Sequence, residues 1–102
     1  MIYLAGPITG IPEHNKPEFD RVAMKLRYLG YKVVSPVEMD GNDFSKPWEW
    51  YMRRDLKILI DCDAVFFLQG WNLSKGAKIE NYLAKALNIP RFCAHTLIMF
   101  KD

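Results

Sequence analysis

Short apolar runs alternate with longer stretches of helical spacing along this chain. The run at 64–68 reads AVFFL without a polar residue, which is typical of a strand buried on both faces of a parallel sheet. Three further runs have a length that suits a β-strand. We therefore predict four strands, at residues 2–5, 31–34, 64–68 and 96–100.

The stretches between the runs have the apolar spacing of amphipathic helices. Asn15 and Ser74 stand where N-caps belong, and Gly30 follows the last apolar position of the first helix. Pro47 suits the first turn of the second helix. The pattern predicts helices at residues 16–29, from 45 or 46 to 60, and at 75–87, with a polar loop at 37–45.

Strands separated by single helices form βαβ units, so the pattern predicts an α/β fold around a parallel sheet. Ligands of such sheets bind beyond the carboxyl ends of the strands. Ordinary strand ends carry the same residue types, so a purely structural role is the alternative. For Trp71 two roles remain open: stacking on a flat ligand ring, and structural wedging, in which the ring packs within the fold. The candidate substrate contacts at these ends are Gly6, Pro7, Ser35, Gly70 and Trp71.

Glu80 lies on the apolar stripe of the third predicted helix, three residues after Ala77 and four before Ala84. A carboxylate there is costly to bury unless it is paired or neutralised, and acids kept in such places are candidates for chemistry. The alternative is that Glu80 reaches the edge of the stripe and pairs with a lysine. Asp55 lies at the margin of the stripe on the second helix, where basic neighbours make an ordinary salt bridge the alternative.

The segment before the third helix has the features of an anion site. A buried strand leads into a loop with Gly70, Ser74 offers a hydroxyl at the helix N-terminus, and Gly76 allows close approach to the backbone. The segment is neither a P-loop nor a dinucleotide fingerprint, and the histidines lack metal-ligand spacing. We therefore expect neither a cofactor nor a metal.

Composition narrows the function classes. With 102 residues, the chain is expected to form one domain, residues 1–102. A net charge of +2, from 14 basic and 12 acidic residues that are interspersed, argues against nucleic-acid and membrane partners. Cys62 and Cys93 do not form a disulfide framework, and Met1 leads directly into the first strand. We expect a cytoplasmic protein with reduced thiols and no signal peptide.

Two carboxylates at one pocket suit the cleavage of a glycosidic bond. One acid attacks or stabilises the anomeric carbon, while another group handles the proton of the leaving group. A buried Glu80 and a more solvated Asp55 would divide these roles through different pKa values. The spacing alone does not say that the sugar carries a base.

Two motifs resemble the nucleoside 2-deoxyribosyltransferase-like superfamily. They are YLAGPITG at residues 3–10 and S-x-G-A-x-x-E-x-x-x-A at 74–84, and the intervening Y-M-x-x-D-L at 51–56 also fits. The similarity spans nearly the whole chain, and it is greatest to a small branch of uncharacterised domains common in phages and bacteria. The resemblance implies a flavodoxin-like or Rossmann-like three-layer fold with a four- to five-stranded parallel sheet.

The resemblance also implies roles for single residues. Glu80 matches the nucleophile of the superfamily, Asp55 its second acid and Tyr3 the tyrosine near that nucleophile, while Ser74 and Gly76 match the loop that meets the sugar or phosphate end. Three functions remain open: a nucleoside deoxyribosyltransferase, a nucleoside 5′-monophosphate N-glycosidase, and a non-catalytic module that binds nucleotides. Each takes a nucleoside or nucleotide as its small-molecule partner.

A homodimer or larger homo-oligomer is expected as well. The second helix carries more apolar surface than one core stripe requires, in Trp48, Trp50, Tyr51 and Met52. A self-complementary contact of this helix about a two-fold axis would cover the surplus. The resemblance likewise implies oligomers whose subunits complete one another's pockets.

Overall fold

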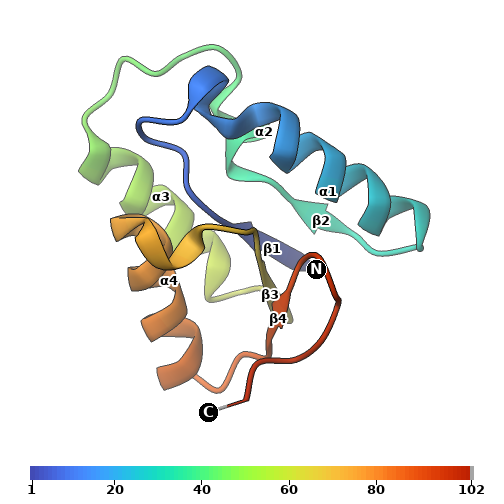
Figure 1. The fold of residues 1–102 in the computed structure, drawn as a ribbon. Coiled ribbons are helices and arrows are strands. Elements are labelled where there is room, and N and C mark those ends of the chain that lie inside the picture. The colour runs from blue at the N-terminus through green and yellow to red at the C-terminus, as the bar shows by residue number, and fades with distance from the viewer. Residues whose placement is uncertain (102) are drawn as a thin grey trace.

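A four-stranded, all-parallel sheet in the order β2-β1-β3-β4 forms the centre of the protein (Figure 1). The structure is a computed structural model and describes residues 1–101. The strands are β1 (Ile2–Ala5), β2 (Val33–Val34), β3 (Ala64–Phe67) and β4 (Arg91–Cys93). The α-helices are α1 (Lys16–Tyr28), α2 (Pro36–Asp40), α3 (Trp48–Leu59) and α4 (Lys75–Ala86), and the 3-10 helices are η1 (Pro12–Asn15) and η2 (Trp71–Leu73).

Helices cover both faces of the sheet because successive strand side chains point to opposite faces. Leu4 and Phe66 pack with Phe19 of α1 in one apolar cluster, whereas Tyr3 and Val65 belong to a second cluster on the other face. Leu59 of α3 and Ala84 of α4 join this second cluster. Figure 1 shows α1 on one side of the sheet and α3 with α4 on the other. The three-layer α/β fold is therefore confirmed.

The fourth strand lies earlier in the chain than the sequence pattern predicts. It occupies Arg91–Cys93 and pairs in parallel with β3, so the prediction at 96–100 is wrong. Met99 forms a single antiparallel bridge with Phe92, and the Phe100 amide donates to the Arg91 carbonyl at 2.7 Å. The predicted apolar run thus folds back along the edge of β4 instead of joining the sheet as a parallel strand.

Two local predictions also fail, for identifiable reasons. Part of the loop predicted at 37–45 is helical, because Pro36 begins α2 at a position where its missing N–H costs nothing. Asn15 does occupy the N-cap position of α1, but its side chain makes no capping hydrogen bond; its backbone is left-handed, and its side-chain amide donates to the Pro7 carbonyl at 2.9 Å. Asn15 therefore ties the loop after β1 to the start of α1.

No helix within residues 1–101 is long and apolar enough to cross a lipid bilayer.

Candidate active site

Two helices each bring one acid into the core on the same face of the sheet. On α4 the buried positions are Ala77, Glu80 and Ala84, so the acid occupies the centre of the buried stripe as the spacing predicts. The lysine pairing considered for Glu80 does not occur within residues 1–101: the residue is only 5% exposed, and no lysine forms an ion pair with it. This carboxyl group is held inside the protein.

Asp55 lies deeper than its predicted place at the margin of a stripe. The buried residues of α3 are Met52, Asp55 and Leu59, with Asp55 5% exposed. Trp48 and Tyr51, which the sequence pattern places on the apolar side, remain half-buried. The helix is therefore rotated about its axis relative to the predicted stripe, and this rotation turns Asp55 towards the core.

Tyr3 joins the two acids from the central strand. Its ring is fully buried in the cluster on the face that α3 and α4 cover. The hydroxyl lies near enough to both carboxyl groups to affect their ionisation, although neither contact has the geometry of a regular hydrogen bond. The structure thus brings together the three residues that the sequence singles out as catalytic.

Arg54 pairs with Asp55 and with a second acid at the end of α2. Its Nε and Nη2 donate to Oδ1 of Asp55 at 3.0 and 2.9 Å, and Nη2 also donates to Oδ1 of Asp40. The Asp40 and Asp55 side chains are 5% and 7% exposed. The salt bridge considered as an alternative for Asp55 therefore does form, but inside the protein and not on its surface.

Burial shifts the titration of all three central groups upward. It raises the pKa of Glu80 to about 8, with the Asp55 charge acting in the same direction and Tyr3 opposing. It raises the pKa of Asp55 to about 6, because Arg54 offsets part of the desolvation. Burial and the two nearby carboxylates raise the pKa of Tyr3 well above its usual value. At pH 7 the proton therefore resides mainly on Glu80, while Asp55 is mainly ionised.

Glu80, Asp55 and Tyr3 line a narrow cavity of about 40 Å³. The loop after β1, Met52 and the first turn of α4 enclose the rest of it. A water molecule takes about 30 Å³ in the liquid, so the cavity has room for little more than one water. A sugar ring reaches Glu80 only if part of this wall moves.

Two glycines of this cavity wall sit where a larger residue would collide with a neighbour. A Cβ on Gly6 would lie 2.8 Å from Cβ of Leu68, and one on Gly76 would lie 3.0 Å from Sδ of Met52. Both contacts are tighter than ordinary packing permits. The missing Cβ of Gly6 makes room for Leu68 on the face that α1 covers, whereas Gly76 lets the first turn of α4 approach Met52 beside the acids.

An aromatic cavity of about 280 Å³ opens beside Asp55 and shares Met52 with the central one. Phe44 and His14 stack at its edge, with ring centroids 3.6 Å apart, and thereby join the loop before α3 to η1. Trp48 and Tyr51 supply further aromatic lining. Figure 1 shows the loop between α2 and α3 arching over the end of the sheet at which the loop after β1 also lies.

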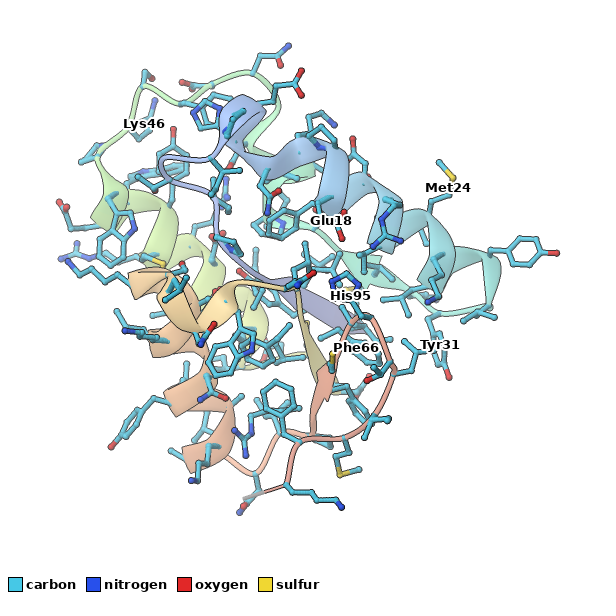
Figure 2. The ribbon with its side chains drawn as sticks, viewed as in Figure 1. Glu18, Met24, Tyr31, Lys46, Phe66 and His95 are labelled. Atoms are coloured by element: carbon cyan, nitrogen blue, oxygen red, sulfur yellow. The ribbon has the colours of Figure 1, made fainter. Side chains whose placement is uncertain are left out.

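A wider, polar cavity of about 630 Å³ lies on the other side, at the start of α4. Ser74 caps that helix by accepting a hydrogen bond from the Ala77 amide at 3.2 Å, and it lines both this cavity and the central one. Arg21, Lys75 and His95 bring basic side chains to the wall, where Glu18 pairs with Arg21 at 2.6 Å. Figure 2 shows Glu18 and His95 on the same side of the molecule.

The remaining predicted contacts divide into three groups. Gly6 and Gly76 line the central cavity with Ser74, while Pro7 and Gly70 line the polar one. Among the described residues, the walls of these three cavities include neither Ser35 nor Trp71. Ser35 is buried, and the Trp71 ring packs against Phe67 and Phe100. For Trp71 the structure favours wedging over stacking on a ligand.

Sequence reasoning missed several residues of the site. Asp40 belonged to a stretch expected to be a loop, and only the tertiary fold brings it to Arg54. The pairing of His14 with Phe44 joins positions 30 residues apart and has no periodic signal. Thr9 lines all three cavities but is not among the predicted contacts.

Comparison with known proteins gives a family but no activity. The family model described as "Domain of unknown function (DUF4406)" matches residues 1–91. No curated protein matches the chain. Because the match covers nearly all of the 102 residues, the chain belongs to the DUF4406 family.

Proposed function

We propose that this protein cleaves or transfers the N-glycosidic bond of a nucleoside or nucleotide, with Glu80 as the nucleophile. The observation that carries the proposal is the meeting of Glu80, Asp55 and Tyr3 in one buried cavity beyond the ends of the central strands. The different pKa values of the two acids suit a division of roles between nucleophile and acid. The motifs shared with the nucleoside 2-deoxyribosyltransferase-like superfamily support the same assignment.

The reaction begins with a proton transfer inside the cavity. Glu80 must lose its proton before it attacks, and Asp55 is the neighbouring base that accepts it, with the Tyr3 hydroxyl beside both carboxyl groups. A separation of two pKa units corresponds to roughly 3 kcal/mol for this transfer. The Glu80 carboxylate then forms an ester with the anomeric carbon, while Asp55 returns the proton to the departing base. Water or a second base then attacks the anomeric carbon, the ester bond to Glu80 breaks, and Asp55 accepts the proton of the attacking group.

The aromatic cavity beside Asp55 has the shape and lining that suit a base. Its rings come from Phe44, His14, Trp48 and Tyr51. Met52 lines both this cavity and the central one that holds Glu80, and its unbranched thioether chain changes conformation at low cost. Movement of Met52 would join the two cavities and give the sugar the space that the central cavity lacks.

A nucleoside 5′-monophosphate N-glycosidase is the second candidate, because a polar cavity adjoins the N-terminus of α4. The exposed amides and dipole of a helix N-terminus favour a phosphate. Ser74 reaches this cavity and the central one, and Lys75 adds a cation. We place the 5′ end of the substrate here.

Replacing Ser74 by alanine is expected to raise the KM for a nucleoside monophosphate more than it lowers kcat. The change removes a hydroxyl at the proposed phosphate site and also the α4 cap, which contributes about 1 kcal/mol to stability. Steady-state kinetics with a nucleoside and its 5′-monophosphate measure the effect. Ser74→Thr keeps the hydroxyl and is the matched control. Equal handling of both substrates by all three proteins would remove the phosphate role.

A non-catalytic nucleotide-binding module is the competing function. The small volume of the central cavity favours it, because a ligand held in the neighbouring cavities would not touch Glu80. Incubation with a panel of deoxynucleosides and deoxynucleotides, with and without an acceptor base, separates the three functions. Free base indicates a hydrolase and exchanged base a transferase. Binding of panel members without either product would defeat the proposed activity.

Trp50→Asp is expected to weaken self-association and activity together. Trp50 is 44% exposed on α3, and we propose that this helix packs against its copy in a homodimer or larger oligomer. A carboxylate in such a contact costs desolvation energy. Sedimentation at micromolar concentration measures the assembly, and Tyr28→Asp, at an exposed position near the end of α1, is the control. A stable, active wild-type monomer of about 12 kDa would contradict the prediction.

A further inference from the structure

Arg54 holds Asp55 in an unusual way. Nε and Nη2 of the guanidinium both donate to Oδ1 of Asp55, and no hydrogen bond described within residues 1–101 uses Oδ2. Arginine more often spreads two donors over the two oxygens of a carboxylate. Here Oδ1 alone accepts from Arg54, and the same carboxyl group lies near Tyr3 and lines both the central and the aromatic cavity.

The guanidinium itself is fixed from three directions. Nη2 donates to the buried side chain of Asp40, and the Arg54 Cζ lies 5.5 Å from the ring centroids of both Trp50 and Tyr51. Tyr51 is anchored in turn, because its hydroxyl donates to the Asp43 carbonyl at 2.8 Å. Cation–π contacts and a charged hydrogen bond restrict the plane of the guanidinium.

We propose that Arg54, clamped by Asp40, is a positioning residue that fixes Oδ1 of Asp55 and leaves Oδ2 to serve Tyr3 and the substrate. The consequence of this positioning for catalysis rests on the proposed function. The effect of Arg54 on the ionisation of Asp55, in contrast, is present in the ligand-free protein. By favouring ionised Asp55, Arg54 keeps the proton of the free protein on Glu80. Asp55 thereby stays ready to accept that proton when a substrate arrives.

Other charged groups around Asp55 do not replace Arg54. The groups that face the acid or its cavities are Tyr3 from β1, Asp40 from α2, Glu80 from α4, His14 from η1, and Lys46 from the loop before α3. Lys46 lies in the loop before α3 (Figure 2) and pairs with Asp43 at 3.7 Å. Arg54 is the cation whose ion pair with Asp55 the structure describes.

A titration of the ligand-free protein tests the proposal. Carboxyl ¹³C NMR follows each acid in the wild type, in Arg54→Gln and in Arg54→Lys. In Arg54→Gln, Asp55 is expected to titrate at least about one pH unit higher, because a paired cation lowers an aspartate by one to three units. Glu80 is expected to titrate lower, because its neighbour then loses its charge. If the substitution merely loosened the packing of the protein, water would reach both acids, and the pKa values of Asp55 and Glu80 would both fall.

The conservative variant separates charge from positioning. Arg54→Lys keeps the cation, so Asp55 should titrate within about half a pH unit of its wild-type value. Because lysine lacks the planar fork of the guanidinium, base release by this variant should nevertheless be lower than in the wild type. Arg53→Gln, an exposed arginine on the same helix, is the matched control and should change neither readout. An unshifted Asp55 in Arg54→Gln would overturn the proposal even if the protein releases base. Shifted acids in a protein without turnover would defeat only the proposed function.

Discussion

Replacing Glu80 by alanine is expected to abolish base release. Glu80 is the carboxyl group that faces both Tyr3 and Asp55 in the central cavity, and no other described residue there can form the sugar ester while Asp55 acts as the acid. Loss of a covalent nucleophile removes the pathway and not merely a binding contact. Chromatography of the deoxynucleoside and deoxynucleotide panel measures free base, and the variant should fall to the uncatalysed background.

The same experiment needs proof that the variant is folded. Alanine suits the centre of α4 and adds no charge to the core, so the circular dichroism spectrum and ligand binding should be retained. Glu49→Ala removes an exposed glutamate of α3 and should keep the full rate. If Glu80→Ala retained most of the turnover, Glu80 would not be the nucleophile.

Local periodicity was sufficient to find the central acid. Glu80 falls on a stripe whose other members, Ala77 and Ala84, are small and buried, and the structure places all three as the spacing predicts. The uninterrupted apolar run at β3 likewise located the strand beside β1. Such predictions use only residues that are close in sequence. They hold in the folded protein because the apolar positions of a helix or strand are the ones that become buried.

Features set by tertiary contacts could not be predicted in the same way. The rotation that buries Asp55 is linked to its pairing with Arg54 and to Asp40, which comes from a different helix. The segment at 96–100 has the composition of a strand, but the place beside β3 is occupied by Arg91–Cys93. In both cases a long-range partner decided between local structures of similar propensity.

Glu80 is also expected to make the protein less stable as the pH rises from about 5 to about 8. The folded protein holds a proton on Glu80 up to about pH 8, whereas the unfolded chain releases it near pH 4.5. Between these values the native state binds more protons than the unfolded state, so the free energy of unfolding falls with rising pH. Above about pH 8 the loss is complete.

Glu80→Gln removes this titrating group, so its free energy of unfolding should increase relative to that of the wild type as the pH rises. The difference in the free energy of unfolding between the two proteins is expected to grow by on the order of 3 kcal/mol from pH 5 to pH 8. Asp55 titrates in both proteins and largely cancels in the difference. Urea unfolding at each pH measures it, with the exposed Glu49→Gln as the control that should stay parallel to the wild type. A difference that stays constant with pH would mean that Glu80 titrates alike in the folded and unfolded chains, and the proton transfer proposed for catalysis would then lose its basis.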